Sequence, residues 1–206
     1  MTGMDHSHRQ ITALPLSLQT VMPWKNGGGS TREIWKVEDA DGILWRASIA
    51  TIHQSGPFSL FSGCDRIITL IDGPPVTLDF EDGETLTLET FAPRSFSCDR
   101  PVSAAIAGTS HDLNLIWRRD AVSVAHQVQA VKGETPLTLP PAHWHLVVVC
   151  DGAVGVAAGG MTETLATGEA LLFGPTPKAQ SLDLTFSTAN GVVLTFGMTE
   201  RSELTP

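Results

Sequence analysis

The sequence predicts an all-β fold, and two observations support this prediction. Glycine (19 residues) and proline (13 residues) separate short runs that are rich in Ile, Val, Leu and Thr. Short apolar runs between turn residues are typical of β-sandwiches and β-barrels, and the apolar period of helices is nearly absent. In addition, the second half of the chain repeats a β-pattern of the first half, which indicates two similar β-units.

The expected strands are short, and they are rich in aliphatic side chains and threonine. They are residues 45–52, 67–71, 85–88, 146–149, 162–165 and 192–196. Their length and composition are those of strands in a β-protein.

The repeat is carried by two segments of eight residues. Residues 66–73 (RIITLIDG) resemble residues 145–152 (HLVVVCDG), and each is an apolar strand closed by Asp-Gly, a strong turn signal. Further along, residues 91–93 (FAP) resemble residues 173–175 (FGP). We therefore predict two copies of one β-unit, with domains at 1–120 and 121–206; the alternative is chance similarity between hairpins.

Composition excludes several classes of protein. Hydrophobic residues make up 42% of the 206 residues, which is enough for a packed core, and the formal net charge is -9. That charge argues against a nucleic-acid partner or an anionic membrane surface. No apolar run reaches the length of a membrane-spanning helix, and residues 1–9 lack the apolar core of a signal peptide. Three cysteines do not make a disulfide framework, so we expect a cytoplasmic protein.

Three polar motifs are not required by an ordinary β-core. They are residues 23–34 (PWKNGGGSTREI), 56–66 (GPFSLFSGCDR) and 112–119 (DLNLIWRR). Each combines aromatic or apolar side chains with ionisable ones, and the first two add glycines. This mixture is typical of a small-molecule pocket with polar groups and an apolar wall.

The three motifs, in this order, resemble those of the HutD/Ves family of bacterial proteins. The resemblance implies a double cupin (bicupin) with an N-terminal barrel that holds the ligand pocket and a C-terminal barrel that completes the fold. It also implies a link to histidine utilisation and to ligands such as urocanate or a formylated or formiminated glutamate. Residues 61–63 (FSG) depart from the Phe-Pro-Gly or Phe-Ala-Gly that is common in the family.

The cupin metal register is not retained, so we predict no metal and no cofactor. Metal cupins carry two histidines and a glutamate, then a glycine seven residues after the glutamate, and a further histidine five residues after a proline. Arg66 stands at the glutamate position of the first unit, and Cys98 stands five residues after Pro93. His143 and His145 have the spacing of a ligand pair, but they lie too close to the following turn; we interpret them as partly buried at a strand entry.

Arg66 is the main candidate for ligand binding, because a guanidinium can hold a carboxylate with two hydrogen bonds. The alternative is a salt bridge to Asp65 or another carboxylate at the barrel rim. Strand alternation places Arg46 and Ser48 on one polar face, and Asn114 offers an amide donor and acceptor.

The glycine-rich motif predicts a loop close to the ligand. Consecutive glycines allow backbone N–H groups to approach an anion, Lys25 adds charge, and the spacing of a nucleotide-binding loop is missing. The alternative is a tight turn with Lys25 in solvent. With Phe58 as an apolar lid, the predicted ligand-binding residues are Trp24, Lys25, Asn26, Gly27, Gly28, Arg46, Ser48, Phe58, Arg66 and Asn114.

Two functions are consistent with these residues. The preferred one is a metal-independent binding protein for a small carboxylate, with a regulatory or accessory role. The alternative is a metal-free hydrolase or isomerase, although no nucleophile stands beside a base in a recognisable motif. The oligomeric state is left open, with a homodimer as one candidate.

Overall fold

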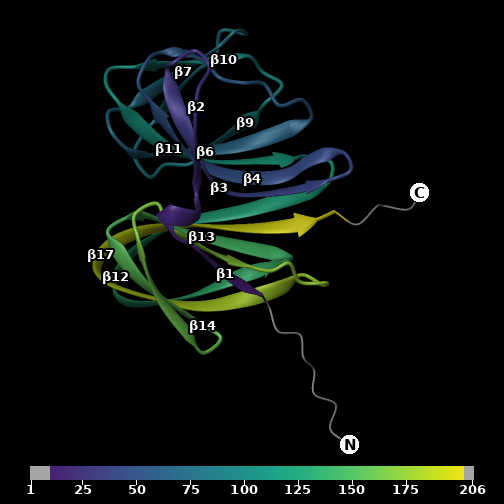
Figure 1. The fold of residues 1–206 in the computed structure, drawn as a ribbon, viewed down its shortest axis with the longest axis vertical. Coiled ribbons are helices and arrows are strands. Elements are labelled where there is room, and N and C mark those ends of the chain that lie inside the picture. The colour runs from purple at the N-terminus through teal and green to yellow at the C-terminus, as the bar shows by residue number, and fades with distance from the viewer. Residues whose placement is uncertain (1–9, 202–206) are drawn as a thin grey trace, which may run out of the picture. The chain divides into compact units, whose positions relative to one another are not determined.

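The computed structural model describes residues 10–201, and their regular structure is almost entirely β (Figure 1). Within that range the one helical element is a single 3-10 turn, η1 (Leu16–Leu18). All six expected strands lie inside observed strands, so the all-β prediction is confirmed. Residues 1–9, expected to lack a signal peptide, lie outside the described residues. No helix within residues 10–201 is long and apolar enough to cross a membrane.

The chain forms two compact units. One unit is made of residues 16–122, and the other combines residues 123–200 with residues 10–15. The second unit takes in the N-terminal strand β1 (Ile11–Leu14) because this strand pairs antiparallel with β16 (Ala170–Phe173). Residues 10–15 therefore group with the C-terminal unit and not with the 1–120 domain of the sequence prediction.

The first unit is built from two antiparallel sheets. The six-stranded sheet has the order β2-β3-β4-β11-β6-β9, and the four-stranded sheet has the order β5-β10-β7-β8. The strands are β2 (Thr20–Pro23), β3 (Gly29–Asp39), β4 (Gly42–Ile52), β5 (Gly56–Pro57), β6 (Cys64–Asp72), β7 (Val76–Phe80), β8 (Thr85–Leu88), β9 (Arg94–Ser97), β10 (Val102–Ile106) and β11 (Ser110–Arg118).

The second unit has a single seven-stranded sheet. Its order is β1-β16-β13-β17-β14-β15, and β12 also pairs with β17. The remaining strands are β12 (Val122–Ala142), β13 (Trp144–Asp151), β14 (Ala153–Ala158), β15 (Met161–Ala166) and β17 (Gln180–Glu200).

The predicted repeat is present at the level of strand pairing. Strand β6 lies between β11 and β9, and β13 lies in the same way between β17 and β16. Each central strand also has a register shift just before its Asp-Gly turn, near Asp72 in β6 and near Asp151 in β13. Residues 66–73 and 145–152 therefore occupy equivalent strands.

One part of the predicted repeat is wrong. Phe91 donates its N–H to the carbonyl of Leu70 (2.8 Å), and Gly168 donates to the equivalent carbonyl of Val149 (2.7 Å). Phe91 and Gly168 also share a left-handed backbone, with φ of 58° and 84°. Phe91 therefore corresponds to Gly168 and not to Phe173, because hydrogen-bond register and not a three-letter pattern sets the equivalence.

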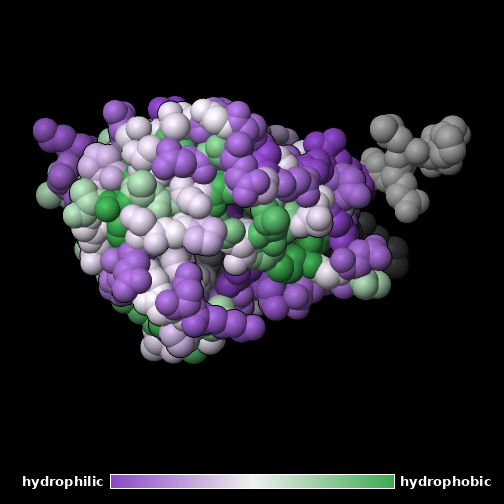
Figure 2. All heavy atoms as spheres, turned by 90° about the horizontal axis from the view of Figure 1, so that it is seen from above, coloured by the Kyte–Doolittle hydropathy of each residue, from purple (hydrophilic) through white to green (hydrophobic). Residues whose placement is uncertain are grey.

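The first unit has an apolar core to which strand β6 contributes. Strand β6 points Arg66, Ile68 and Leu70 to one face; Ile68 and Leu70 belong to the core, and Arg66 continues the same face. On the face drawn in Figure 2, hydrophobic side chains gather in small groups among hydrophilic ones, in keeping with the net charge of -9. The same face of β6 thus carries both the core and a buried cation.

Candidate functional site

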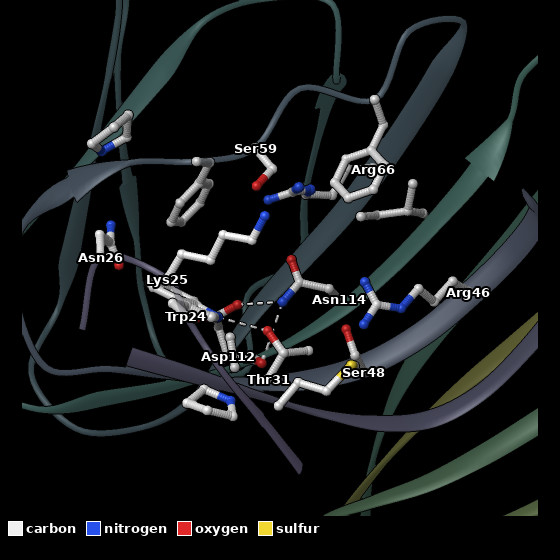
Figure 3. A pocket seen from close by; sticks show the side chains of 17 residues that line it. Trp24, Lys25, Asn26, Thr31, Arg46, Ser48, Ser59, Arg66, Asp112 and Asn114 are labelled. Atoms are coloured by element: carbon white, nitrogen blue, oxygen red, sulfur yellow. Dashed lines mark hydrogen bonds between the residues drawn. The ribbon is translucent and has the colours of Figure 1, made fainter. Parts of the chain in front are cut away.

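A cavity of about 550 Å³ lies in the first unit, over one face of the six-stranded sheet (Figure 3). All predicted ligand-binding residues except Gly27 and Gly28 line it. These are Trp24, Lys25, Asn26, Arg46, Ser48, Phe58, Arg66 and Asn114. Several further residues line the cavity that were not among the predicted ones, including Thr31, Ser59 and Asp112.

Strand alternation accounts for the floor of the cavity. Arg46 and Ser48 point into it from β4, as expected, and Asn114 points into it from β11. The register sets Asn114 opposite Ser48 and sets Ile116 opposite both Arg46 and Arg66. Arg118, on the same face of β11, does not line the cavity; it is held by an ion pair with Asp39.

Arg66 is a buried cation, only 6% exposed. Its guanidinium carbon lies 5.2 Å from the ring centre of Phe58, 5.9 Å from that of Phe61 and 5.7 Å from that of Phe96, which is the range of cation–π contacts. Its Nε has no hydrogen-bond partner among the described residues.

The rim salt bridge considered for Arg66 is not formed. Asp65 pairs instead with Arg119, with 2.9 Å between Oδ1 and Nε. No carboxylate of residues 10–201 makes an ion pair with Arg66 or Lys25, whereas Arg46 is paired with Glu33 at 2.7 Å. The charge of Arg46 is thus balanced locally, and Arg66 and Lys25 are the cations left to face a ligand.

The loop between β2 and β3 is shaped by its own hydrogen bonds. The Gly27 N–H donates to the Trp24 carbonyl (3.0 Å), and the Gly28 N–H donates to Asn26 Oδ1 (3.0 Å). Gly27 and Gly28 do not line the cavity, and both of their amides are used inside the turn. The turn instead presents Lys25 and Asn26 to the cavity, and Trp24 is fixed by a 2.8 Å bond from Nε1 to Thr31 Oγ1.

Asp112 lines the cavity and was not among the predicted ligand-binding residues. Its side chain is 1% exposed, and Asn114 Nδ2 donates a hydrogen bond to its Oδ1. Burial raises the pKa of Asp112 to about 6, opposed by the bond from Asn114 and by the charge of Arg66. Alternation was the available signal, since Asp112 stands two residues before Asn114 on the same face of β11.

The cysteines near the cavity are not activated nucleophiles. Burial raises the pKa of Cys98, and the nearby charge of Arg66 only partly opposes this. Burial likewise raises the pKa of Cys64. Since the thiolate is the reactive form, both thiols are poorly suited to attack a substrate.

The two histidines of the second unit have separate hydrogen bonds. His143 Nδ1 accepts from the Glu200 N–H (3.0 Å), and His145 Nε2 lies 2.8 Å from the Pro140 carbonyl. Within the described part of the chain, no group of three or more His, Cys, Asp and Glu side chains is arranged to hold a metal ion.

Comparison with known proteins identifies the family. The family model described as HutD matches residues 17–193. The chain belongs to the HutD family. It is 42% identical over 113 residues to protein Ves of Citrobacter koseri, covering 53% of this chain and 56% of Ves. It is also 43% identical over 99 residues to an uncharacterised 21.2 kDa protein from the hutC 3′ region of Pseudomonas putida, covering 47% and 52% of the two chains. The chain thus spans about half the length of these two relatives.

Solved structures agree with the HutD assignment. HutD from Pseudomonas fluorescens SBW25 superposes with a TM-score of 0.80 at 32% identity, over 94% of this chain and all of that one. A cupin 2 conserved barrel protein from Leptotrichia buccalis, at 10% identity and a TM-score of 0.54, shows likeness of fold alone. The predicted double-cupin fold is confirmed.

Proposed function

We propose that this HutD-family protein is a metal-independent cupin that binds a small carboxylate metabolite. The ligand class is that of urocanate or of formyl- or formimino-glutamate, and the role is regulatory or accessory in histidine utilisation. The relative from the hutC 3′ region supports the connection with this pathway. The cysteines of residues 10–201 are all free thiols, which is compatible with a place in the cytoplasm.

The observation that carries this proposal is the state of Arg66. A buried guanidinium without a carboxylate partner is unfavourable unless something else meets its charge and its N–H groups. Arg66 lies on the wall of the cavity, braced by three aromatic rings, and its Nε lacks a hydrogen-bond partner within the described residues. A ligand carboxylate would supply both the charge and the acceptor atoms.

A thermal-shift screen tests the proposal. The probes are urocanate, N-formylglutamate and formiminoglutamate, with methyl urocanate and histamine as controls that lack a carboxylate. A ligand that binds only the folded state raises the melting temperature, so we expect a rise with at least one acid and none with the controls. If none of the acids raises the melting temperature, or if the controls raise it equally, the proposal is wrong.

Asp112 is the one observation that favours the alternative, a metal-free enzyme. A carboxyl group with a pKa of about 6 inside a cavity can take up and release a proton near neutral pH. Incubation of each acid with the protein, followed by chromatography, tests this alternative. Product that forms with the parent protein and not with Asp112→Asn would establish an enzyme.

A further inference from the structure

The cavity holds two buried acceptor atoms whose partners are missing among the described residues. They are Asp112 Oδ2 and Asn114 Oδ1. Both side chains line the cavity, and they are 1% and 6% exposed. Buried polar atoms are nearly always hydrogen-bonded, and leaving one without a partner is destabilising. A pair of such atoms in one cavity points to a ligand that donates hydrogen.

The orientation of the Asn114 amide follows from its neighbours. Its Nδ2 donates to Asp112 Oδ1 and lies 3.5 Å from the Asp112 carbonyl oxygen, and both of these atoms accept hydrogen bonds. The reverse orientation would set the amide oxygen against two acceptors, which is unfavourable. Asn114 Oδ1 therefore faces away from Asp112, and it is one of the two buried acceptor atoms, on two residues that line the cavity, without a partner among the described residues.

These acceptors lie at a distance from the cationic end of the cavity. Arg66 is opposite Ile116 in the sheet, whereas Asp112 stands four residues further along β11. Four residues of extended strand span about 13 Å between Cα atoms, and the side chains reduce that gap. Figure 3 shows Arg66, Asn114 and Asp112 around the cavity, with Lys25 reaching in from the loop. The cavity therefore has a donor end and an acceptor end.

We propose that the Asp112–Asn114 end binds an N–H group of the ligand while Arg66 binds its carboxylate. The ligand class is thus a small acid whose far end carries a donating nitrogen, as in an imidazole, an amidine or a secondary amide. This inference rests on the proposed function and makes it more specific. Above a pH of about 6 Asp112 is ionised, so it accepts hydrogen bonds and favours donors with positive character.

Two acids of matched shape test this assignment. Urocanate carries its acrylate on an imidazole ring, and trans-3-(2-furyl)acrylate has the same acrylate on a five-membered ring without an N–H. Titration calorimetry at pH 7.5 should show that the parent protein binds urocanate at least tenfold more tightly. The reason is that the furan leaves both acceptors without hydrogen and sets its ring oxygen near a carboxylate.

Variants then identify the residue responsible. Asp112→Asn keeps the shape but removes the charged acceptor, so it should lose most of the preference for urocanate while still binding furylacrylate. Asp79→Asn removes an exposed carboxylate of β7 and should leave the preference unchanged. Arg66→Ala should weaken the binding of both acids.

The outcomes separate the two proposals. If the parent protein binds both acids equally and Arg66→Ala weakens both, carboxylate binding stands and the N–H inference is overturned. An unchanged preference in folded Asp112→Asn also overturns the inference. If neither acid binds the parent protein, both the N–H inference and the proposal that the protein binds urocanate are wrong.

Discussion

Arg66 and His145 occupy the same position in the two copies of the β-unit. Each lies opposite a phenylalanine of the neighbouring strand, Phe96 for Arg66 and Phe173 for His145. His145 is fully buried, and its ring nitrogen lies within hydrogen-bonding distance of a main-chain carbonyl, whereas Arg66 borders a cavity. The same strand position is therefore fully buried in the second unit, at His145, and borders the candidate site in the first unit, at Arg66.

Replacement of Arg66 should weaken ligand binding. Loss of a buried, charge-assisted hydrogen bond costs roughly 1.5–3 kcal/mol, which is about a tenfold to hundredfold rise in Kd. Arg66→Ala should show this in titration calorimetry with an acid that the thermal-shift screen identifies. Arg66→Lys should also weaken binding, since an ammonium group cannot form the two parallel bonds of a guanidinium. Arg119→Ala, whose side chain pairs with Asp65 and Asp99, should bind as the parent does. Tight binding by a folded Arg66→Ala protein would contradict the site.

Asp112 should make stability depend on pH. Its pKa in the folded state, about 6, lies above the usual value of 3.8, so the folded protein holds a proton that the unfolded chain releases between these values. Its contribution to stability is therefore greatest at low pH and is lost as pH rises through about 6. At pH 8, Asp112→Asn should be more stable than the parent by about 1–3 kcal/mol, and the difference should shrink at pH 4.

Urea denaturation of both proteins at pH 8 and pH 4 measures this effect. The exposed replacement Asp79→Asn controls for the change in net charge. A destabilised Asp112→Asn at pH 8, with the control unchanged, would show that the carboxylate is well stabilised within the protein.

Gly29 should be intolerant of a side chain. A Cβ atom there would lie 2.3 Å from the Thr51 carbonyl oxygen and 3.0 Å from the Trp24 ring. Gly29→Ala must therefore push β3 away from β4 and displace Trp24, at a cost of about 1–3 kcal/mol in the free energy of unfolding. Gly56→Ala is the control, since its Cβ would meet no atom within 4 Å. Equal urea midpoints for the two variants would show that the loop adjusts freely.

The purified protein should carry no stoichiometric transition metal. Arg66 replaces the glutamate of the cupin register, and the rings of His143 and His145 have main-chain hydrogen-bond partners. Elemental analysis by mass spectrometry measures this directly. Stoichiometric iron, nickel or zinc that disappears in His143→Ala or His145→Ala would contradict the prediction.

Local patterns predicted much of the site because strand alternation is a local rule. Strand alternation in residues 45–52 puts Arg46 and Ser48 on one polar face, the side-chain amide marks Asn114 as a ligand-binding candidate, and all three residues line the cavity. The glycine-rich loop was recognised by composition, but its hydrogen bonds depend on the turn it forms. Composition alone therefore could not show that the amides of Gly27 and Gly28 are used within the loop.

The sequence by itself determined the all-β class, the duplicated strand closed by Asp-Gly, and the residue types available for a carboxylate site. Only the tertiary structure decided which charges remain without a partner, because ion pairs such as Arg46–Glu33 and Arg119–Asp65 join residues on different strands. It also decided that Asp112 is buried beside Asn114 and that one of its carboxylate oxygens has no hydrogen-bond partner among the described residues. Burial and pairing are properties of strands brought together in space, so a pattern along one strand cannot specify them.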